Sequence, residues 1–234
     1  MSADVFRFKH FVISQQGAAM KVGTDGVLVG AWASAGDICR RILDVGTGTG
    51  VIALMAAQRW PEATVTGIES DTDAAECARR NAAASQWSDR IEIVHDAVQN
   101  YFPEERFDLI VSNPPYYDVS LPCPDSARSN ARHTHTLTFA ELCVAARRLL
   151  LPDGRFAVIV PSESVRAFVA AGDMHLVRRC DVKTTPTKPP KRTMLEFSTR
   201  FSGAAQCDTL VIGDGSGGYD DRYKALVGDF YLDF

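Results

Sequence analysis

Cysteine pairs, long apolar runs and a strong excess of one charge are all missing from this sequence. Its six cysteines are scattered through 234 residues without a CxxC pair, which is typical of reduced thiols and argues against a disulfide framework. No uncharged run approaches the roughly 20 residues of a membrane-spanning helix. Asp4, Arg7 and Lys9 stand where a secretory leader would have its apolar run. We therefore expect a cytoplasmic protein that does not cross a membrane.

Internal repeats and low-complexity tracts are also absent. Apolar residues at 46% and charged residues at 23% are ordinary for a globular chain and exclude a disordered or fibrous one. The length is close to that of one domain, and it suffices to bury a core without a disulfide or a metal. We expect a single domain over residues 1–234.

The net charge is only −4, but the charge is unevenly distributed. Residues 176–200 contain seven basic residues against two acidic ones, Asp181 and Glu196. Such a cluster is commonly just a solvated face, yet it is also where phosphate contacts would be sought. The basic residues are Arg178, Arg179, Lys183, Lys188, Lys191, Arg192 and Arg200.

Short β-branched runs alternate with longer amphipathic runs through the middle of the chain, which is typical of parallel strands joined by crossover helices. After residue 175 three strand-like runs follow one another without a crossover helix, so we expect them to pair antiparallel at the sheet edge. Together the runs predict an α/β fold. Strands are expected over 40–46, 64–69, 91–97, 107–114, 154–161, 176–184, 193–201 and 207–213, and helices over 51–60, 71–85, 137–150, 162–172 and 222–234.

The first expected strand ends in LDVGTGTG, a glycine-rich turn at the edge where open α/β sheets bind ligands. A dinucleotide fingerprint would require a glycine at Val51, and its absence argues against a nicotinamide oxidoreductase. Asp44, before the first glycine, repels a pyrophosphate but accepts an ammonium group. Gly46, Gly48 and Gly50 let the backbone approach an uncharged thioether nucleoside.

Two more acidic residues end the next two expected strands. Glu69 stands where such folds commonly bind ribose hydroxyls, and Asp96 is placed to accept a hydrogen bond from an adenine amino group. Each of them alone is as easily a helix cap or a solvated carboxylate. Three acids at the ends of three successive strands favour a ligand site.

LDVGTGTG followed by an acid at the end of the second strand resembles the class I S-adenosylmethionine-dependent methyltransferases. The resemblance implies a Rossmann-like fold with a mostly parallel seven-stranded sheet, helices on both faces and an antiparallel strand near one edge. It also implies S-adenosyl-L-methionine as the cofactor. In that pattern Asp44 and the three glycines line the methionine side, Glu69 binds the ribose, and Asp96 with Ala97 holds the adenine.

The fourth expected strand leads into Asn113, Pro114, Pro115 and Tyr116. Asn-Pro is by itself a common way to end a strand. Combined with the glycine loop on the neighbouring strand, it resembles the amino-methyltransferases with a (D/N/S)PP(Y/F) motif, which methylate nitrogens attached to planar, electron-withdrawing systems. The resemblance places Asn113 at the cofactor as well as at the acceptor.

The chemistry explains why such residues are needed. An exocyclic amine on a purine delocalises its lone pair into the ring and is a poor nucleophile. The side-chain carbonyl of Asn113 and the backbone carbonyl of Pro114 can accept its two N–H bonds and favour a pyramidal nitrogen. The two prolines restrict the backbone so that both acceptors are set in advance, and Tyr116 offers a flat surface for the base. No strong general base is required.

FKHF, MKVGTDG, ARHT and the terminal DFYL resemble, with NPPY, the bacterial tRNA (adenine-N6)-methyltransferases that modify adenine 37 beside the anticodon. The implied partner is the anticodon region of a tRNA. The resemblance divides the domain into a cofactor-covering segment over 1–36, a catalytic core over 37–201 and a C-terminal extension over 202–234. It places Lys21 and Thr24 near the cofactor, although a solvated lysine and a helix-capping threonine would have the same sequence.

Several alternatives remain open at this point. The same pocket would hold a guanine N2 in ribosomal RNA or a glutamine amide in a protein, and a non-catalytic RNA-binding protein is a third possibility. His133, His135 and Cys123 lack a zinc spacing, so we expect no metal. Arg128 and Arg132, with His133, face substrate phosphates or belong to an ordinary polar loop. Nothing in the sequence indicates an obligate partner subunit, so we expect a monomer.

Overall fold

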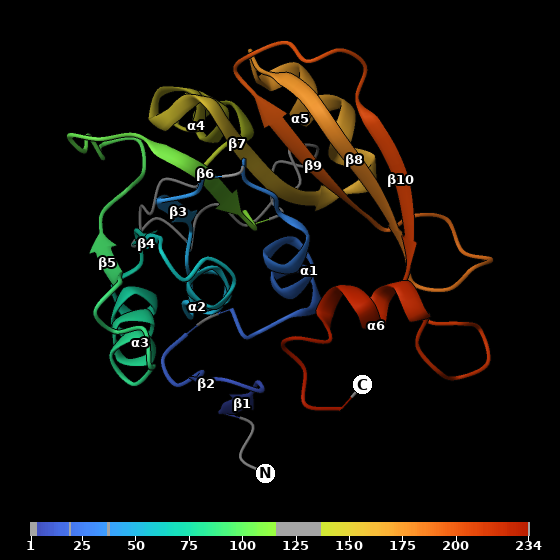
Figure 1. Ribbon diagram of the computed structural model, residues 1–234, viewed down its shortest axis with the longest axis horizontal. Helices are drawn as coiled ribbons and strands as arrows, with labels where there is room; N and C mark the ends of the chain where they lie inside the picture. The colour runs from blue at the N-terminus through green and yellow to red at the C-terminus, as the bar shows by residue number, and fades with distance from the viewer. Residues whose placement is uncertain (1–3, 19, 37, 116–136, 234) are drawn as a thin grey trace, which may run out of the picture.

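The computed structural model describes residues 4–18, 20–36, 38–115 and 137–233. It contains an eight-stranded sheet with helices on both sides and a small two-stranded sheet (Figure 1). The large sheet consists of β3 (Arg41–Val45), β4 (Thr64–Glu69), β5 (Ile91–His95), β6 (Phe107–Ser112), β7 (Leu150–Pro161), β8 (His175–Lys183), β9 (Arg192–Ser198) and β10 (Gln206–Val211). The helices are α1 (Thr24–Trp32), α2 (Val51–Arg59), α3 (Thr72–Ala83), α4 (Phe139–Leu149), α5 (Val165–Ala171) and α6 (Asp221–Val227).

The strands lie in the order β10-β8-β9-β7-β6-β3-β4-β5. Only β9 runs against the others, since it pairs antiparallel with both β7 and β8 while the remaining pairs are parallel. The expected mostly parallel sheet with an antiparallel strand near one edge is therefore confirmed. The sheet has eight strands, as many as the expected strand runs, and one more than the seven that the family resemblance implies.

One pairing differs from the expectation. β10 pairs parallel with β8, not antiparallel. The reason is the reversed direction of β9, which brings the chain to the edge of the sheet where β8 begins. The short loop over residues 199–205 then passes β8 and starts β10 in the same direction, so no crossover helix is needed. As a result every strand of the large sheet except β9 ends at one common edge.

The sheet is covered on both faces, as expected. One apolar cluster joins α1, α2 and α6 to one face, and a second joins α4 and α5 to the other (Figure 1). Neighbours on β3 belong to different clusters, Ile42 to the first and Leu43 to the second. This is why the central strands are apolar at nearly every position.

The N-terminal segment forms a hairpin that the sequence did not predict, made of β1 (Val5–Arg7) and β2 (Val12–Ser14). Phe8 stacks on Phe11 and on Tyr231, with ring centroids 4.5 and 5.9 Å apart. The chain ends therefore pack together, and the terminal helix stops at Val227 instead of continuing to residue 234. In the described part of the chain, no helix is long and apolar enough to cross a membrane.

Candidate active site

The glycine-rich turn connects β3 to α2 at the edge where the parallel strands end. Gly46, Gly48 and Gly50 have φ values of +71°, +56° and +83°, in the left-handed region that favours glycine. A Cβ on Gly50 would touch Ala78 of α3 at 3.5 Å, whereas a Cβ on Gly46 would meet nothing within 4 Å. The turn thus packs closely on its α3 side and has open space beside its first glycine.

Asp44 is fully buried in β3. Its Oδ2 accepts hydrogen bonds from the Thr47 hydroxyl and from the backbone N–H of Ala53. Its Oδ1 is buried without a hydrogen-bond partner among the described residues. Burial raises the pKa of Asp44 to about 7, and the charge of Glu69 adds to this while the two hydrogen bonds oppose it. This buried acceptor beside the glycine turn is open to a donor from a bound molecule.

Glu69 joins the turn to the end of β4. Its Oε2 accepts from the backbone N–H of Gly48 at 3.0 Å. Its Oε1 accepts from the N–H groups of Ser70 and Asp71 at 2.9 and 3.0 Å. Asp96, at the end of the next strand, accepts from its neighbour's N–H at 2.7 Å. Both carboxylates are therefore fixed by backbone donors.

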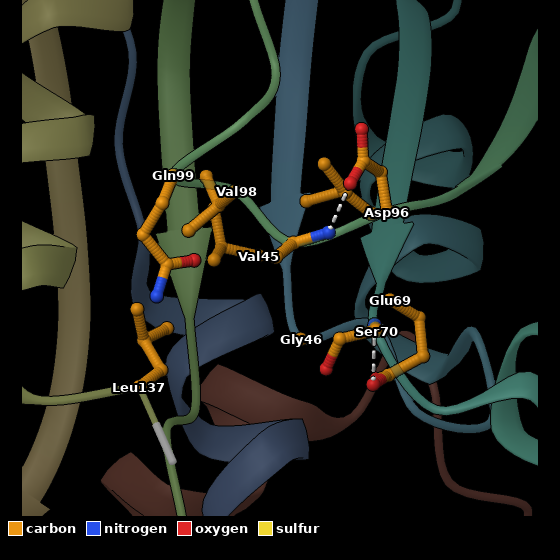
Figure 2. A pocket seen from close by; sticks show the side chains of 10 residues that line it. Val45, Gly46, Glu69, Ser70, Asp96, Val98, Gln99 and Leu137 are labelled. Atoms are coloured by element: carbon orange, nitrogen blue, oxygen red, sulfur yellow. Dashed lines mark hydrogen bonds between the residues drawn. The ribbon is translucent and has the colours of Figure 1, made fainter. Parts of the chain in front are cut away.

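A cavity of about 50 Å³ opens between the ends of β3, β4 and β5. Figure 2 shows the side chains of Glu69, Ser70 and Asp96 on one side of it, and those of Gln99 and Leu137 on the other. Of the residues expected at a cofactor site, the cavity brings together Gly46, Glu69, Asp96 and Ala97, and it adds Val45, Ile68, Ser70, Val98, Gln99 and Leu137. Val98 and Gln99 directly follow the expected strand, but nothing in the local pattern marks Leu137.

Asn113 leaves β6 beside the glycine turn. Ser112 is paired with Val45, and its hydroxyl donates to the Val45 carbonyl at 2.9 Å. The next residues, Asn113 and Gly46, therefore emerge side by side from adjacent strands. Asn113 is half-buried, Pro114 is buried and Pro115 is half-buried. Tyr116 lies outside the described residues, as do Cys123, Arg128, Arg132, His133 and His135.

Helix α1 approaches the Asn113 amide closely. A Cβ placed on Gly26 would lie 3.8 Å from Asn113 Nδ2. Lys21 and Thr24, in the same segment, do not line the cavity between Glu69 and Asp96. Lys21 is exposed with its ammonium 4.0 Å from the Asp4 carboxylate. Thr24 is the exposed first residue of α1, and the N-cap is Gly23.

Two polar residues that the sequence did not single out support the turn. Thr47 donates to Asp44, as described above. Asn81 of α3 is buried, and its Nδ2 donates to the carbonyls of Thr49 and Ser14 at 2.8 and 2.9 Å. Its Oδ1 accepts from the Ser14 N–H at 2.9 Å. Asn81 thus ties the glycine turn to the N-terminal hairpin, a contact without any local sequence signal.

Gly67, in the middle of β4, supports the turn by having no side chain. A Cβ there would lie 2.8 Å from Thr47 Oγ1 and 2.8 Å from Ile93 Cδ1. A glycine inside a buried strand is the sequence feature that could have indicated this close approach of Thr47 to β4.

We expect Gly67→Ala to lower the free energy of unfolding by about 1–3 kcal/mol, because the methyl group displaces Thr47 from Asp44. Gly36→Ala is the matched control, since a Cβ there would meet nothing within 4 Å. Urea unfolding of both variants measures the difference. Equal stability of the two would contradict the proposed contact.

The basic residues after position 175 are mostly paired. Arg178 donates to the buried Glu196 at 3.1 Å and stacks on Trp32 at 4.2 Å. Burial raises the pKa of Glu196, and Arg178 and the two Ser34 hydrogen bonds oppose this. The other ion pairs of this group are Arg179 with Asp181, Arg192 with Asp25, and Arg200 with Asp153. The number of charged residues in this stretch did not reveal which of them are paired.

Within the described ranges, no group of His, Cys, Asp or Glu residues could hold a metal.

Comparison with known proteins gives a consistent result. The family model described as methyltransferase small domain matches residues 23–170. The chain is 46% identical to a tRNA1(Val) (adenine(37)-N6)-methyltransferase of Porphyromonas gingivalis over 245 residues, covering 99% of this chain and 96% of that protein.

Solved structures agree on the fold. A predicted O-methyltransferase from Agrobacterium tumefaciens matches with a TM-score of 0.68 and 22% identity, covering 88% of this chain and 96% of the other. A glycopeptide N-methyltransferase in complex with S-adenosyl-L-methionine matches with a TM-score of 0.54 and 13% identity, covering 77% of this chain and all of the other. These matches confirm the class I methyltransferase fold. The chain belongs to the methyltransferase small domain family and, within it, to the group of the tRNA1(Val) (adenine(37)-N6)-methyltransferases.

Proposed function

We propose that this enzyme transfers a methyl group from S-adenosyl-L-methionine to the N6 amino group of adenine 37 in a tRNA, with tRNA1(Val) as the substrate. Similarity over nearly the whole length to proteins of that name supports the substrate. The observation that carries the chemistry is the emergence of Asn113 beside Gly46, on adjacent parallel strands. This arrangement puts an amide carbonyl next to the proposed cofactor turn.

The residues at the turn fit this cofactor. The open, buried Oδ1 of Asp44 suits the ammonium group of the methionine part. A carboxylate offers about four acceptor positions, and Glu69 uses three for backbone N–H groups, which leaves one for a ribose hydroxyl. Asp96, with Ala97, borders the space proposed for the adenine. When bound, S-adenosylmethionine supplies an electrophilic methyl group on a sulfonium.

Asn113 and Pro114, which we call the acceptor corner, activate the amine by the placement of their carbonyl oxygens. Asn113 Oδ1 and the Pro114 carbonyl accept the two N–H bonds of the adenine amino group and turn its lone pair out of the ring. Pro115 holds the backbone in this shape, and Tyr116 is proposed to stack on the base. The nitrogen–carbon bond forms as the sulfur–carbon bond breaks, and the excess proton leaves to solvent. Positioning therefore provides most of the catalysis.

The organisation of the chain is part of the proposal. Residues 1–36 cover the cofactor edge, and the bonds of Asn81 to Ser14 and Thr49 support this placement. Lys21 and Thr24 belong to this covering segment. Residues 37–201 form the catalytic core and 202–234 an extension of it. We propose that the enzyme acts as a monomer in the cytoplasm, where its tRNA substrate is found.

The test is incubation of the protein with labelled S-adenosylmethionine and bulk RNA or protein, followed by nucleoside mass spectrometry. We expect N6-methyladenosine in the tRNA fraction, at position 37. A transcript with guanine at that position is the control and should remain unlabelled. Label in ribosomal RNA or only in protein would overturn the substrate assignment.

A further inference from the structure

A second cavity, of about 200 Å³, lies on the other side of α1 from the acceptor corner. It is much larger than the roughly 30 Å³ that one water occupies in the liquid. Leu28 of α1, Val182 of β8 and Ile212 after β10 form its apolar part. The hydroxyl-bearing Thr24 and Thr184 and the cationic Lys191 supply its polar part.

The position of this cavity relates it to the reaction. β8 and β10 run parallel to β6 in the sheet (Figure 1). Their carboxyl ends therefore lie at the same edge as the carboxyl end of β6, which Asn113 follows. The N-terminal turn of α1 is a shared wall, because Gly26 is close to the Asn113 amide while Thr24 and Asp25 line the cavity. Helix α1 therefore contributes residues to both the cavity and the surroundings of Asn113. The cavity therefore lies on the same edge of the sheet as the site proposed for the target base, where neighbouring nucleotides would have to pass.

The charge around the cavity is positive. The loop from Lys183 to Arg192 contains four basic residues and no acidic one. Asp25 is the acidic residue on the wall, and its Oδ2 accepts from Arg192 Nε at 2.8 Å. The exposed Lys191 ammonium makes no ion pair or hydrogen bond to any described residue. A phosphate would therefore meet a net positive rim.

Lys191 is held in place by its backbone. Its N–H donates to the Val182 carbonyl at 2.9 Å, and its carbonyl accepts from the N–H of Ser162 at 3.3 Å. Pro189 and Pro190 precede it and restrict the approach of the loop. The backbone of Lys191 is therefore fixed at the rim of the cavity. Binding a phosphate would cost little backbone entropy at this residue.

We propose that this cavity binds the sugar–phosphate backbone of the tRNA substrate next to the target adenine. The inference rests on the proposed function and adds to it a binding site outside the acceptor corner. Leu28, Val182 and Ile212 would contact the ribose, and Lys191 with the threonine hydroxyls would contact the phosphate. No aromatic side chain of the described residues lines the cavity, so it offers no stacking platform for a base. Such a site fixes the register of the RNA without reading its sequence.

The test compares Lys191→Ala with Arg106→Ala in steady-state methylation of tRNA at several salt concentrations. Arg106 is exposed and directly precedes β6, at the opposite edge of the sheet, so it matches the change of charge. We expect Lys191→Ala to raise KM for tRNA roughly tenfold and to reduce the slope of log KM against log salt by about 0.7, the value for one single-strand phosphate contact. The kcat and the affinity for S-adenosylmethionine should not change.

Two further comparisons make the result specific. Transcripts with altered bases beside position 37 should lose affinity by the same factor in Lys191→Ala, because the contact is to the backbone. Lys191→Glu should raise KM further than alanine does. An unchanged salt slope in Lys191→Ala, or an equal effect of Arg106→Ala, would overturn the inference while the wild-type methylation still supports the function. Absence of tRNA methylation by the wild type would instead overturn the proposed function.

Discussion

Replacing Asn113 by alanine is expected to lower kcat for tRNA methylation by about 10²–10³-fold, the usual effect of removing one preorganised polar group from a reacting centre. The alanine cannot accept an N–H bond of the adenine amine, so the nitrogen lone pair stays in the ring. Asp44, Glu69 and Asp96 are untouched, and S-adenosylmethionine binding should remain measurable by calorimetry. Single-turnover methylation of tRNA measures the chemical step apart from product release.

Asn113→Asp is the matched control. It keeps a side-chain oxygen of the same reach and should restore part of the rate, because a carboxylate also accepts hydrogen bonds. If Asn113→Ala turned over at the native rate, the acceptor corner would be wrongly assigned. If it failed to bind the cofactor, the residue would act mainly on the cofactor side.

The second large effect is the pH dependence of cofactor binding. Asp44 has its pKa raised to about 7, foremost by burial and further by the charge of Glu69. A cationic ammonium group requires the ionised carboxylate, so below pH 7 binding must release a proton. Affinity for S-adenosylmethionine should therefore fall as the pH falls below neutrality. We expect a loss of up to about 100-fold between pH 8 and pH 5.

Asp44→Asn tests the origin of this dependence. Its side-chain oxygen can still accept from Thr47 and Ala53, so the turn keeps its shape. At pH 8 the variant should bind S-adenosylmethionine about 100-fold more weakly, because a buried charge loses its partner. It should also show a flat profile from pH 5 to 8 in calorimetric titrations. An unaltered wild-type slope in the variant would assign the titration to another group.

Much of the fold was predictable because the central strands are buried on both faces. Their apolar runs are distinct from the amphipathic helices, so the strands from β3 to β9 were found near their observed positions. Helix α1 was missed because it is buried on most sides and contains Gly26 and Gly30, and it therefore lacks an amphipathic stripe. The strands of the hairpin have three residues each, too few for a periodic pattern. The direction of β10 depends on the reversal of β9, which no local pattern encodes.

Part of the candidate site could likewise be predicted from the sequence, and part could not. Gly46, Glu69, Asp96 and Asn113 end strands or follow them directly, and parallel strands bring such positions to one edge. That these residues lie at one edge of the sheet was therefore predictable. The hydrogen bonds that hold them were not, because donors such as the Gly48 N–H are matched to their acceptors only after folding. The cavity behind α1 depends on three segments distant in sequence.

The contact of Asn81 with Thr49 and Ser14 has a consequence for biosynthesis. A chain leaving the ribosome exposes LDVGTGTG before the residue that fixes it has been made, since Asn81 follows Thr49 by 32 positions and Ser14 by 67. The turn is therefore held in place by contacts between residues that are far apart in sequence. Such contacts form more slowly than a local helix does. We expect a nascent chain that ends before α3 to carry every glycine of the motif without the contacts that hold the turn in place.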